Sequence, residues 1–210
     1  MGYRIAVLRQ GVAFPEAEVT LATDHYLGWA ASINQLAKHV MEIDNQVQWL
    51  VVANDDTDPD LCHPPDQIAL ECGRHFGSTF GVMQPTGDRW RDDSGEVCIE
   101  HYAGSPWLGR EWCQRAYSGN GPICSVYHHC FADRELMLVA KELGVYWERQ
   151  DLIHLHNHWR RTGQQIPWAA AIDQDYTEFI PVFWERLRAG WPGHVPLPGT
   201  RSTGRPSSSC

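Results

Sequence analysis

An apolar run that stops abruptly at a cluster of acids, residues 49–60 with the sequence WLVVANDDTDPD, constrains this chain more than any other segment. Consecutive apolar residues with two β-branched valines are typical of a strand covered on both faces, and the Asn, Asp and Pro residues after them favour a loop. In α/β sheets, ligands bind at the carboxyl ends of the strands. Adjacent carboxylates repel each other unless a cation offsets their charge, and Mg²⁺ and Mn²⁺ prefer oxygen ligands. The run therefore predicts either a metal site at a strand end or a solvated Asp-rich turn.

Size and composition are those of a globular protein with one core. The chain has 210 residues, of which 43% are hydrophobic and 20% are charged, so one domain is the simplest organisation. We expect residues 1–189 to form this domain and residues 190–210, where Pro, Gly, Ser and Thr dominate, to form a flexible tail. No apolar run reaches the roughly 18 residues of a membrane span, and the first residues lack a signal-peptide core. We therefore expect no membrane contact and a cytoplasmic location.

The net charge indicates which classes of binding partner are disfavoured, and the cysteine content indicates the redox compartment. The formal net charge of −9 argues against broad affinity for nucleic acids or anionic membranes, because such binding depends on Lys and Arg. The seven cysteines are odd in number and include no C-x-x-C pair, which favours a reducing compartment over a disulfide framework.

Strand-like and helix-like segments alternate along the chain, which predicts an α/β fold. The segment over residues 18–53 reads as strand, helix and strand, and such a unit favours a parallel pair. A later helix is bounded by Asp133 as its N-cap and Gly144 as the residue after its end, and another is expected to break at Pro181. The expected strands are at 4–8, 18–22, 49–53 and 80–83, and the expected helices are at 28–40, 66–72, 131–144 and 173–188. His154, His156 and His158 follow the third of these helices and would share one face of an extended segment.

The motifs come in a recognisable order. A strand that ends in an Asp precedes a Gly-Trp-Ala-x-x-x-Asn helix, the strand that ends in Asn-Asp-Asp, a Gly-Ser-x-x-Leu segment, a Phe-x-Asp-x-Glu-Leu helix and the histidine segment. Over about residues 18–160 this order resembles the GT-A-fold glycosyltransferases, most closely small family-2-like enzymes in a compact, phage-type form. The resemblance implies a GT-A-like, Rossmann-related fold, with a central mixed sheet flanked by helices in a single domain. Enzymes of that family usually open with a longer strand–helix–strand nucleotide-binding half, which is abbreviated in this chain.

The resemblance also implies a divalent metal, Mn²⁺ or Mg²⁺, that Asp56 and His156 bind together with the diphosphate of a nucleotide-sugar donor, expected to be a UDP-sugar. Such an ion stabilises the negative charge that develops on the leaving nucleoside diphosphate. Asp55 would lie by the ribose or support the metal ligands. His154 and His158 would support the ligands or contact the phosphates.

For the transfer itself, the resemblance assigns Asp133 as the general base that removes the proton of the acceptor hydroxyl, with Glu135 as a substitute. The alternatives are a helix cap for Asp133 and a surface carboxylate near a helix dipole for Glu135. Asn34 is alternatively a helix-surface residue, and Trp107 a core residue. The implied nucleotide-sugar contacts are Asp24, Gly28, Asn34, Asp55, Gly104, Ser105 and Trp107.

The sequence allows more than one acceptor and more than one class of reaction. A hydroxymethylated pyrimidine in phage DNA is one expected acceptor, in the host cytoplasm, because the chain is compact and carries Arg160 and Arg161 beside the histidines; the acidic net charge argues against it. A metal-dependent phosphoester hydrolase, nuclease-like and built on His154, His156 and the two acids of the Asn-Asp-Asp turn, is an alternative. A noncatalytic module that binds nucleotides or carbohydrates is another.

Overall fold

Four short strands form the central sheet, and they follow the order β3 (Trp49–Val51), β8 (Trp107–Gly109), β5 (Val82–Pro85) and β9 (Tyr146–Arg149). Strand β8 is antiparallel to both of its neighbours, whereas β5 and β9 are parallel. The protein is therefore a single-domain, mixed α/β protein. This computed structural model describes residues 4–9, 15–91, 95, 97–99 and 102–194.

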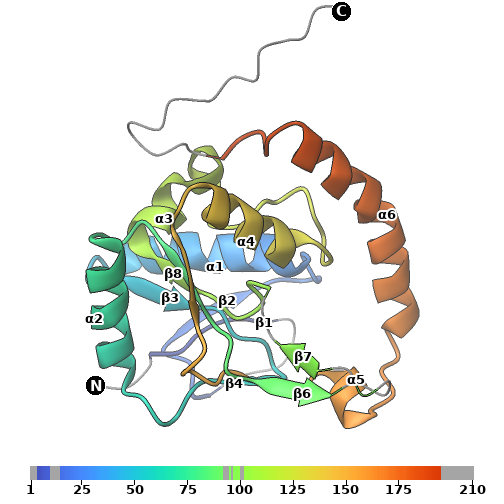
Figure 1. Cartoon of the computed structure of the whole chain (residues 1–210), viewed down its shortest axis with the longest axis horizontal. Helices are drawn as coiled ribbons and strands as arrows, with labels where there is room; N and C mark the ends of the chain where they lie inside the picture. The colour runs from blue at the N-terminus through green and yellow to red at the C-terminus, as the bar shows by residue number, and fades with distance from the viewer. Residues whose placement is uncertain (1–3, 10–14, 92–94, 96, 100–101, 195–210) are drawn as a thin grey trace, which may run out of the picture.

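Helices cover both faces of this sheet (Figure 1). The helices of the described residues are α1 (Trp29–Ile43), α2 (Pro65–Phe76), α3 (Arg110–Arg115), α4 (Ala132–Glu142), α5 (Trp159–Thr162) and α6 (Ala169–Arg188), with a 3₁₀ turn at Ala116–Gly119. Successive strand residues point to opposite faces. Val82 and Leu108 therefore join the larger core with residues of α1, α3 and α4, whereas Met83 and Trp107 join a smaller core with residues of α2.

The remaining strands pair in twos. They are β1 (Ala6–Arg9) parallel to β2 (Val19–Ala22), β4 (Thr57–Asp58) antiparallel to β10 (Leu155–His156), and β6 (Arg89–Arg91) antiparallel to β7 (Val97–Ile99). The predicted strand–helix–strand unit is present as β2, α1 and β3. Its predicted parallel pair is wrong, because β2 pairs with β1 while β3 forms the edge of the central sheet beside β8.

Helix α6 lies along one side of the molecule, from α5 to the neighbourhood of α4 (Figure 1). It continues through Pro181, so the predicted break is wrong. Trp191 is buried, with its ring centroid 5.5 Å from that of Phe183. The predicted tail thus includes a residue that packs on α6, and residues 195–210 of that tail lie outside the described residues. In the described part of the chain, no helix has the length and apolar character to cross a lipid bilayer.

Candidate functional site

The turn after β3 and strand β10 bring Asp56 and His156 together. Asp56 Oδ2 lies 3.2 Å from His156 Nε2, and the two side chains are 38% and 19% exposed. The backbone fixes this approach, because His156 is paired with Thr57 in the β4–β10 ribbon and Asn157 N donates to Asp56 O at 2.8 Å. The two residues predicted to bind a metal thus lie side by side and reach solvent.

Local hydrogen bonds hold the turn that carries Asp55 and Asp56. Thr57 Oγ1 accepts from Asn54 N at 2.8 Å and donates to Asn54 O at 3.0 Å. Trp29 Nε1, at the start of α1, donates to Asn54 Oδ1 at 3.1 Å. The turn is therefore held by the Thr57 hydroxyl and by the indole of a neighbouring helix.

Asp88 and Arg161 hold the backbone of His156 from the other side. The buried Asp88 carboxylate accepts from His156 N at 3.0 Å and from Arg161 Nη1 at 2.6 Å. Arg161 Nη1 also donates to His156 O at 3.1 Å. Arg161, which the sequence suggested as a DNA contact, therefore forms hydrogen bonds that position the backbone of His156.

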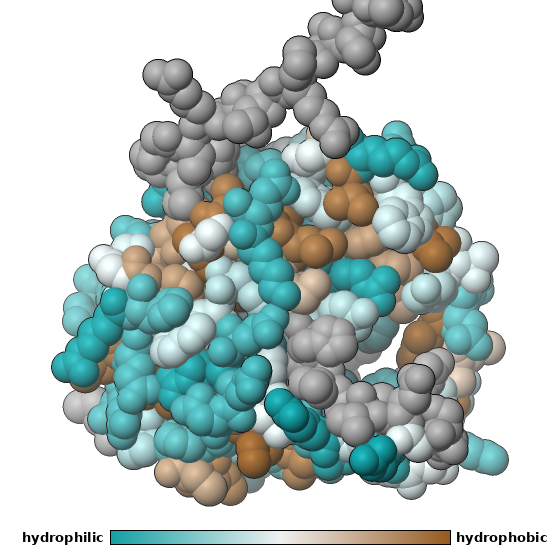
Figure 2. Space-filling model, in the orientation of Figure 1, coloured by the Kyte–Doolittle hydropathy of each residue, from teal (hydrophilic) through white to brown (hydrophobic). Residues whose placement is uncertain are grey.

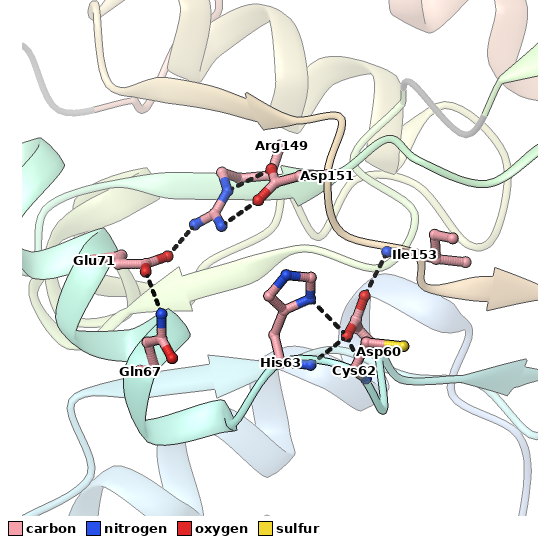
Figure 3. A network of polar contacts seen from close by, with 8 residues as sticks. All are labelled: Asp60, Cys62, His63, Gln67, Glu71, Arg149, Asp151 and Ile153. Atoms are coloured by element: carbon pink, nitrogen blue, oxygen red, sulfur yellow. Dashed lines mark hydrogen bonds and ion pairs between the residues drawn. The ribbon is translucent and has the colours of Figure 1, made fainter.

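Asp60 joins the two chain segments that flank the β4–β10 ribbon, after β4 and before β10 (Figure 3). Its buried carboxylate accepts from the backbone N–H groups of Cys62 and His63, and from Ile153 N, each at 2.8 Å. Burial by itself raises the pKa of Asp60, but the hydrogen bonds from Ile153, His63 and Cys62 together hold that pKa below its ordinary value. The ionised carboxylate thus joins the segment after β4 to the segment before β10.

Arg149 extends this network to helix α2 (Figure 3). Its guanidinium binds both carboxylate oxygens of Asp151, at 2.8 and 2.6 Å, and Glu71 Oε2 at 2.7 Å. Because Glu71 belongs to α2 and Arg149 ends β9, the ion pairs fix the chain that leads into the His156 segment.

The three alternating histidines do not share one face, so that prediction is wrong. The paired strand covers only Leu155–His156 of this segment, and the chain enters α5 at Trp159. His154 is buried. The His158 ring meets the His156 ring edge-on, with centroids 5.2 Å apart, so His158 stays beside the candidate site whereas His154 lies in the interior.

Asp56 and His156 fit two neighbouring positions around a divalent ion. Ligands at right angles, with bonds of about 2.1 Å, lie about 3 Å apart, close to the observed 3.2 Å. Within residues 4–194, as far as they are described, no three His, Cys, Asp or Glu side chains are grouped to hold a metal. A carboxylate oxygen with an imidazole nitrogen suits Mn²⁺ better than Mg²⁺, and the other positions on the ion would belong to water or to a substrate.

Asp133 lies in the first turn of α4 instead of at its N-cap. The N-cap is Phe131, with φ 74° in the left-handed region, and the helix begins at Ala132. The predicted cap is therefore wrong by two residues, because the preceding loop turns sharply at Phe131. Asp133 Oδ1 accepts from Arg134 N at 2.8 Å, and the half-buried carboxylate keeps the favourable position at the helix N-terminus.

Glu135 is buried and bonded inside the fold, a position that favours a structural role over the predicted substitute base. Its side chain is 0% exposed. Oε2 accepts from Tyr127 Oη at 2.7 Å and from Arg186 Nε at 2.8 Å, and Oε1 accepts from Arg186 Nη2 at 2.6 Å. Burial and the hydrogen bond to Glu135 raise the pKa of Tyr127. The surface alternative is wrong, because Glu135 joins α4 to α6 inside the core.

Two of the predicted nucleotide-sugar contacts serve the fold. Asn34 is buried; its Nδ2 donates to Ile123 O at 2.7 Å and its Oδ1 accepts from Ile123 N at 3.0 Å. Neither the predicted ligand contact nor the helix-surface alternative agrees with this position. Gly28 has φ 90°, and a Cβ there would lie 2.5 Å from His128 O. The close approach that requires this glycine is therefore made to a neighbouring loop.

The Gly-Ser-x-x-Leu segment borders the end of β3, because Val52 N donates to Pro106 O at 2.9 Å. Trp107 is buried in the smaller core, which confirms the core alternative for this residue. Ser105 is also buried, and its N–H donates to Gln84 Oε1 at 3.3 Å. Two further predicted contacts reach solvent: Gly104 is half-buried, and Asp24 is exposed after β2.

A group of rings and acids beside Trp29 was not predicted from the sequence. His128 Nδ1 lies 3.3 Å from Asp175 Oδ1, and the Tyr26 ring meets the His128 ring edge-on at 5.3 Å. Burial, followed by the charges of Asp175 and Asp55, raises the pKa of Tyr26 to about 12. The three ring and acid partners come from distant segments, and the only local signal is a pair of consecutive histidines shortly before α4.

Comparison with known proteins returns no match: no family model, no curated protein and no solved structure is similar to the chain. A function for this site therefore has to be inferred from its side chains and from the order of its motifs.

Proposed function

We propose that the protein is a metal-dependent glycosyltransferase of the GT-A type, which moves a sugar from a nucleotide sugar, taken to be a UDP-sugar, to a hydroxyl acceptor. The observation that carries this proposal is the Asp56–His156 pair, with Oδ2 and Nε2 3.2 Å apart. The pair combines an Asn-Asp-Asp turn after an apolar strand with a histidine late in the domain. This is the arrangement that the resemblance to GT-A enzymes implies.

The architecture supports the same proposal. A mixed sheet with helices on both faces is expected for a GT-A-like fold, and the strand that ends in the acids belongs to that sheet. Asp133 lies in the first turn of α4, which comes between β8 and β9 in the chain, and a helix N-terminus favours a carboxylate.

Each side chain has a definite task in the proposed reaction. Asp56 and His156 would hold a divalent ion, which would supply positive charge to stabilise the leaving diphosphate. The acceptor oxygen forms a bond to the anomeric carbon while the bond from that carbon to the diphosphate oxygen breaks. The diphosphate leaves with the electron pair of that bond, and the Asp133 carboxylate takes the proton of the acceptor hydroxyl.

The hydrolase alternative has less support. It required His154 beside His156 as a ligand, but His154 is buried in the interior. Catalytic metal centres of hydrolases commonly have three protein ligands, and the described residues contain no such group of three His, Cys, Asp or Glu. A pair of protein ligands suits an ion that a diphosphate substrate completes.

Release of UDP from UDP-sugars tests the proposal. The wild-type protein, with Mn²⁺ and a panel of UDP-hexoses, is expected to release UDP slowly even without acceptor, and EDTA should abolish the release. Asp56→Asn should remove the activity, whereas Asp58→Asn, which changes an exposed acid two residues later, should retain it. Equal release in EDTA, or equal loss in both variants, would contradict the proposal.

A further inference from the structure

Three half-exposed rings come from the loop before α1, the loop before α4, and α6: the rings of Tyr26 and His128 meet edge-on at 5.3 Å, and Tyr176 follows Asp175, the partner of His128, along α6. Tyr26 and Tyr176 are 48% and 46% exposed, and the His128 side chain is 50% exposed. We call Tyr26, His128 and Tyr176 the ring wall. In the space-filling view, the surface opens between the body of the molecule and α6, the helix that carries Tyr176 (Figure 2).

The ring wall is continuous with the candidate active site. Trp29 N donates to His128 O at 2.7 Å, and the indole of the same residue donates to Asn54 in the acidic turn at 3.1 Å. On the other side, the Tyr176 ring lies 4.8 Å from the ring of Phe131, the residue that caps the helix bearing Asp133. The wall thus flanks both the metal turn and the proposed base.

His128 is held in place from two directions. Its backbone is packed so closely against Gly28 that a Cβ there would lie 2.5 Å from His128 O. Its ring faces the buried Asp175, whose Oδ1 is 3.3 Å from Nδ1 and whose Oδ2 accepts from Cys130 N at 2.6 Å. A carboxylate at Nδ1 favours the tautomer with the proton on that nitrogen, so Nε2 of the neutral ring is a hydrogen-bond acceptor.

The charges around the wall are negative. Residues 169–180, the first part of α6, contain Asp173, Asp175 and Glu178 but no Lys or Arg. Arg134, in the first turn of α4, is engaged by Tyr102, since its Nη2 donates to Tyr102 Oη at 2.9 Å. Binding of nucleic acids depends on cationic side chains that neutralise phosphates, so this surface suits an uncharged ligand better than a polyanion.

We propose that the ring wall is the acceptor subsite, that it takes an uncharged hydroxyl compound such as a glycoside, and that His128, positioned by Asp175, accepts a hydrogen bond from it. The assignment rests on the proposed glycosyltransferase function. Aromatic rings provide flat apolar contacts for such a compound, and the imidazole Nε2 and carboxylates accept hydrogen bonds from its hydroxyl groups. Asp175 acts through His128 and is therefore a positioning residue.

The test combines ligand titration with transfer kinetics, using p-nitrophenyl β-glucoside, β-galactoside and α-mannoside as probes. In protein labelled with ¹⁵N-histidine, at least one glycoside should shift the ring signals of His128 but not those of His39, which lies about 15 Å along α1 from Trp29. With UDP-hexoses and Mn²⁺, His128→Gln should raise the KM for the glycoside about tenfold, the effect of losing one hydrogen bond, with a smaller change in kcat. Asp175→Asn should act in the same direction, and His39→Gln should match the wild type.

Three results overturn the acceptor subsite: His128 signals that no glycoside shifts, a KM that His128→Gln and His39→Gln change equally, or transfer to duplex DNA with 5-hydroxymethylcytosine in place of the glycosides. A wild-type protein that fails to bind UDP would overturn the proposed function instead. The histidine titration needs neither donor nor metal, so it still tests the ring wall in that case. His128→Gln should keep the UDP affinity of the wild type.

Discussion

Asp56 Oδ2 and His156 Nε2 lie 3.2 Å apart although 100 residues separate them in the chain. The two-residue ribbon of β4 and β10 produces this contact, and the carboxylates of Asp60 and Asp88 hold the ribbon from two sides. The candidate metal site is therefore a property of backbone pairing and buried acids as much as of the ligands.

Asp88→Ala tests whether support behind His156 sets the metal affinity. The change removes the acceptor for His156 N and for Arg161, so the imidazole loses its fixed position. We expect Mn²⁺ affinity, measured from the loss of the free-ion signal in electron paramagnetic resonance, to fall about tenfold or more. Asp58→Ala, at an exposed acid of the same ribbon, should change it little; unchanged affinity in Asp88→Ala would separate this network from the metal site.

Asp133→Asn tests the proposed general base. The amide has nearly the shape of the carboxylate but cannot take a proton, so donor binding should stay near the wild-type value. Transfer should fall by about 10²- to 10⁴-fold, the usual scale for a lost general base. Turnover at the wild-type rate would remove Asp133 from this role and favour a mechanism without a protein base.

Glu135→Gln separates stability from catalysis on the same helix. The substitution leaves the Arg186 guanidinium without its buried charge partner, so we expect the free energy of unfolding to fall by about 3 kcal/mol or more. Glu142→Gln, at an exposed position of α4, should stay within about 0.5 kcal/mol of the wild type. Urea denaturation measures both. A stable Glu135→Gln protein that loses only transfer would return Glu135 to the reaction.

Stability in acid should depend on the carboxylates of the Asp60 and Arg149 network. Hydrogen bonds from Arg149 lower the pKa of Asp151, and those from Gln67 and Arg149 lower the pKa of Glu71, while the pKa of Asp60 is also lowered. Because the unfolded chain then binds more protons, this stabilisation is complete above the ordinary pKa values of 3.8 and 4.5 and is lost as the pH falls through them toward the folded values.

Asp60→Asn checks the pH dependence. Its unfolding free energy should lie below that of the wild type at pH 7, and the difference should shrink as the pH falls below about 4, where the wild-type carboxylate itself becomes protonated. Urea denaturation across pH 3 to 7 measures this difference. A difference that stays constant over this range would mean that the charge of Asp60 contributes nothing to stability.

Gly28→Ala tests the junction between α1 and the loop of His128. The position combines φ 90° with a Cβ that would lie 2.5 Å from His128 O, so the substitution should destabilise the fold by about 1–3 kcal/mol. Gly73→Ala, inside α2, where beyond the neighbouring residues and the helix's own backbone no atom lies within 4 Å of the new Cβ, should be neutral or stabilising by up to about 1 kcal/mol. Thermal denaturation of the two variants compares them; equal stability would contradict the packing of His128 on Gly28.

Local patterns predicted much of the fold. The apolar run before the acids forms β3, and the periodic segments form α1, α2, α4 and α6. These elements are predictable because strand and helix periodicities depend on residues that are close together in the chain. Motif order also brought Asp56 and His156 into one prediction. The failures concern partners that are distant in the chain: Arg186 for Glu135, and Ile123 for Asn34.

The local backbone conformation could not be predicted from the sequence either. The left-handed Phe131 displaced the cap of α4 from Asp133, and a strand of only two residues kept the histidines from sharing a face. The His128–Asp175 contact joins a loop to a helix 47 positions later, and no local motif marks it. Such contacts arise from packing among whole elements, which residue spacing does not encode.

Calorimetric titration of the purified protein with UDP, with and without Mn²⁺, measures whether the protein has a metal-dependent UDP site. We expect binding that requires Mn²⁺, that is stronger for UDP than for other nucleoside diphosphates, and that Asp56→Ala weakens severely because the ion loses a ligand. Absence of binding to any nucleoside diphosphate in the presence of Mn²⁺, or unchanged affinity in Asp56→Ala, would contradict the proposed metal-dependent UDP site.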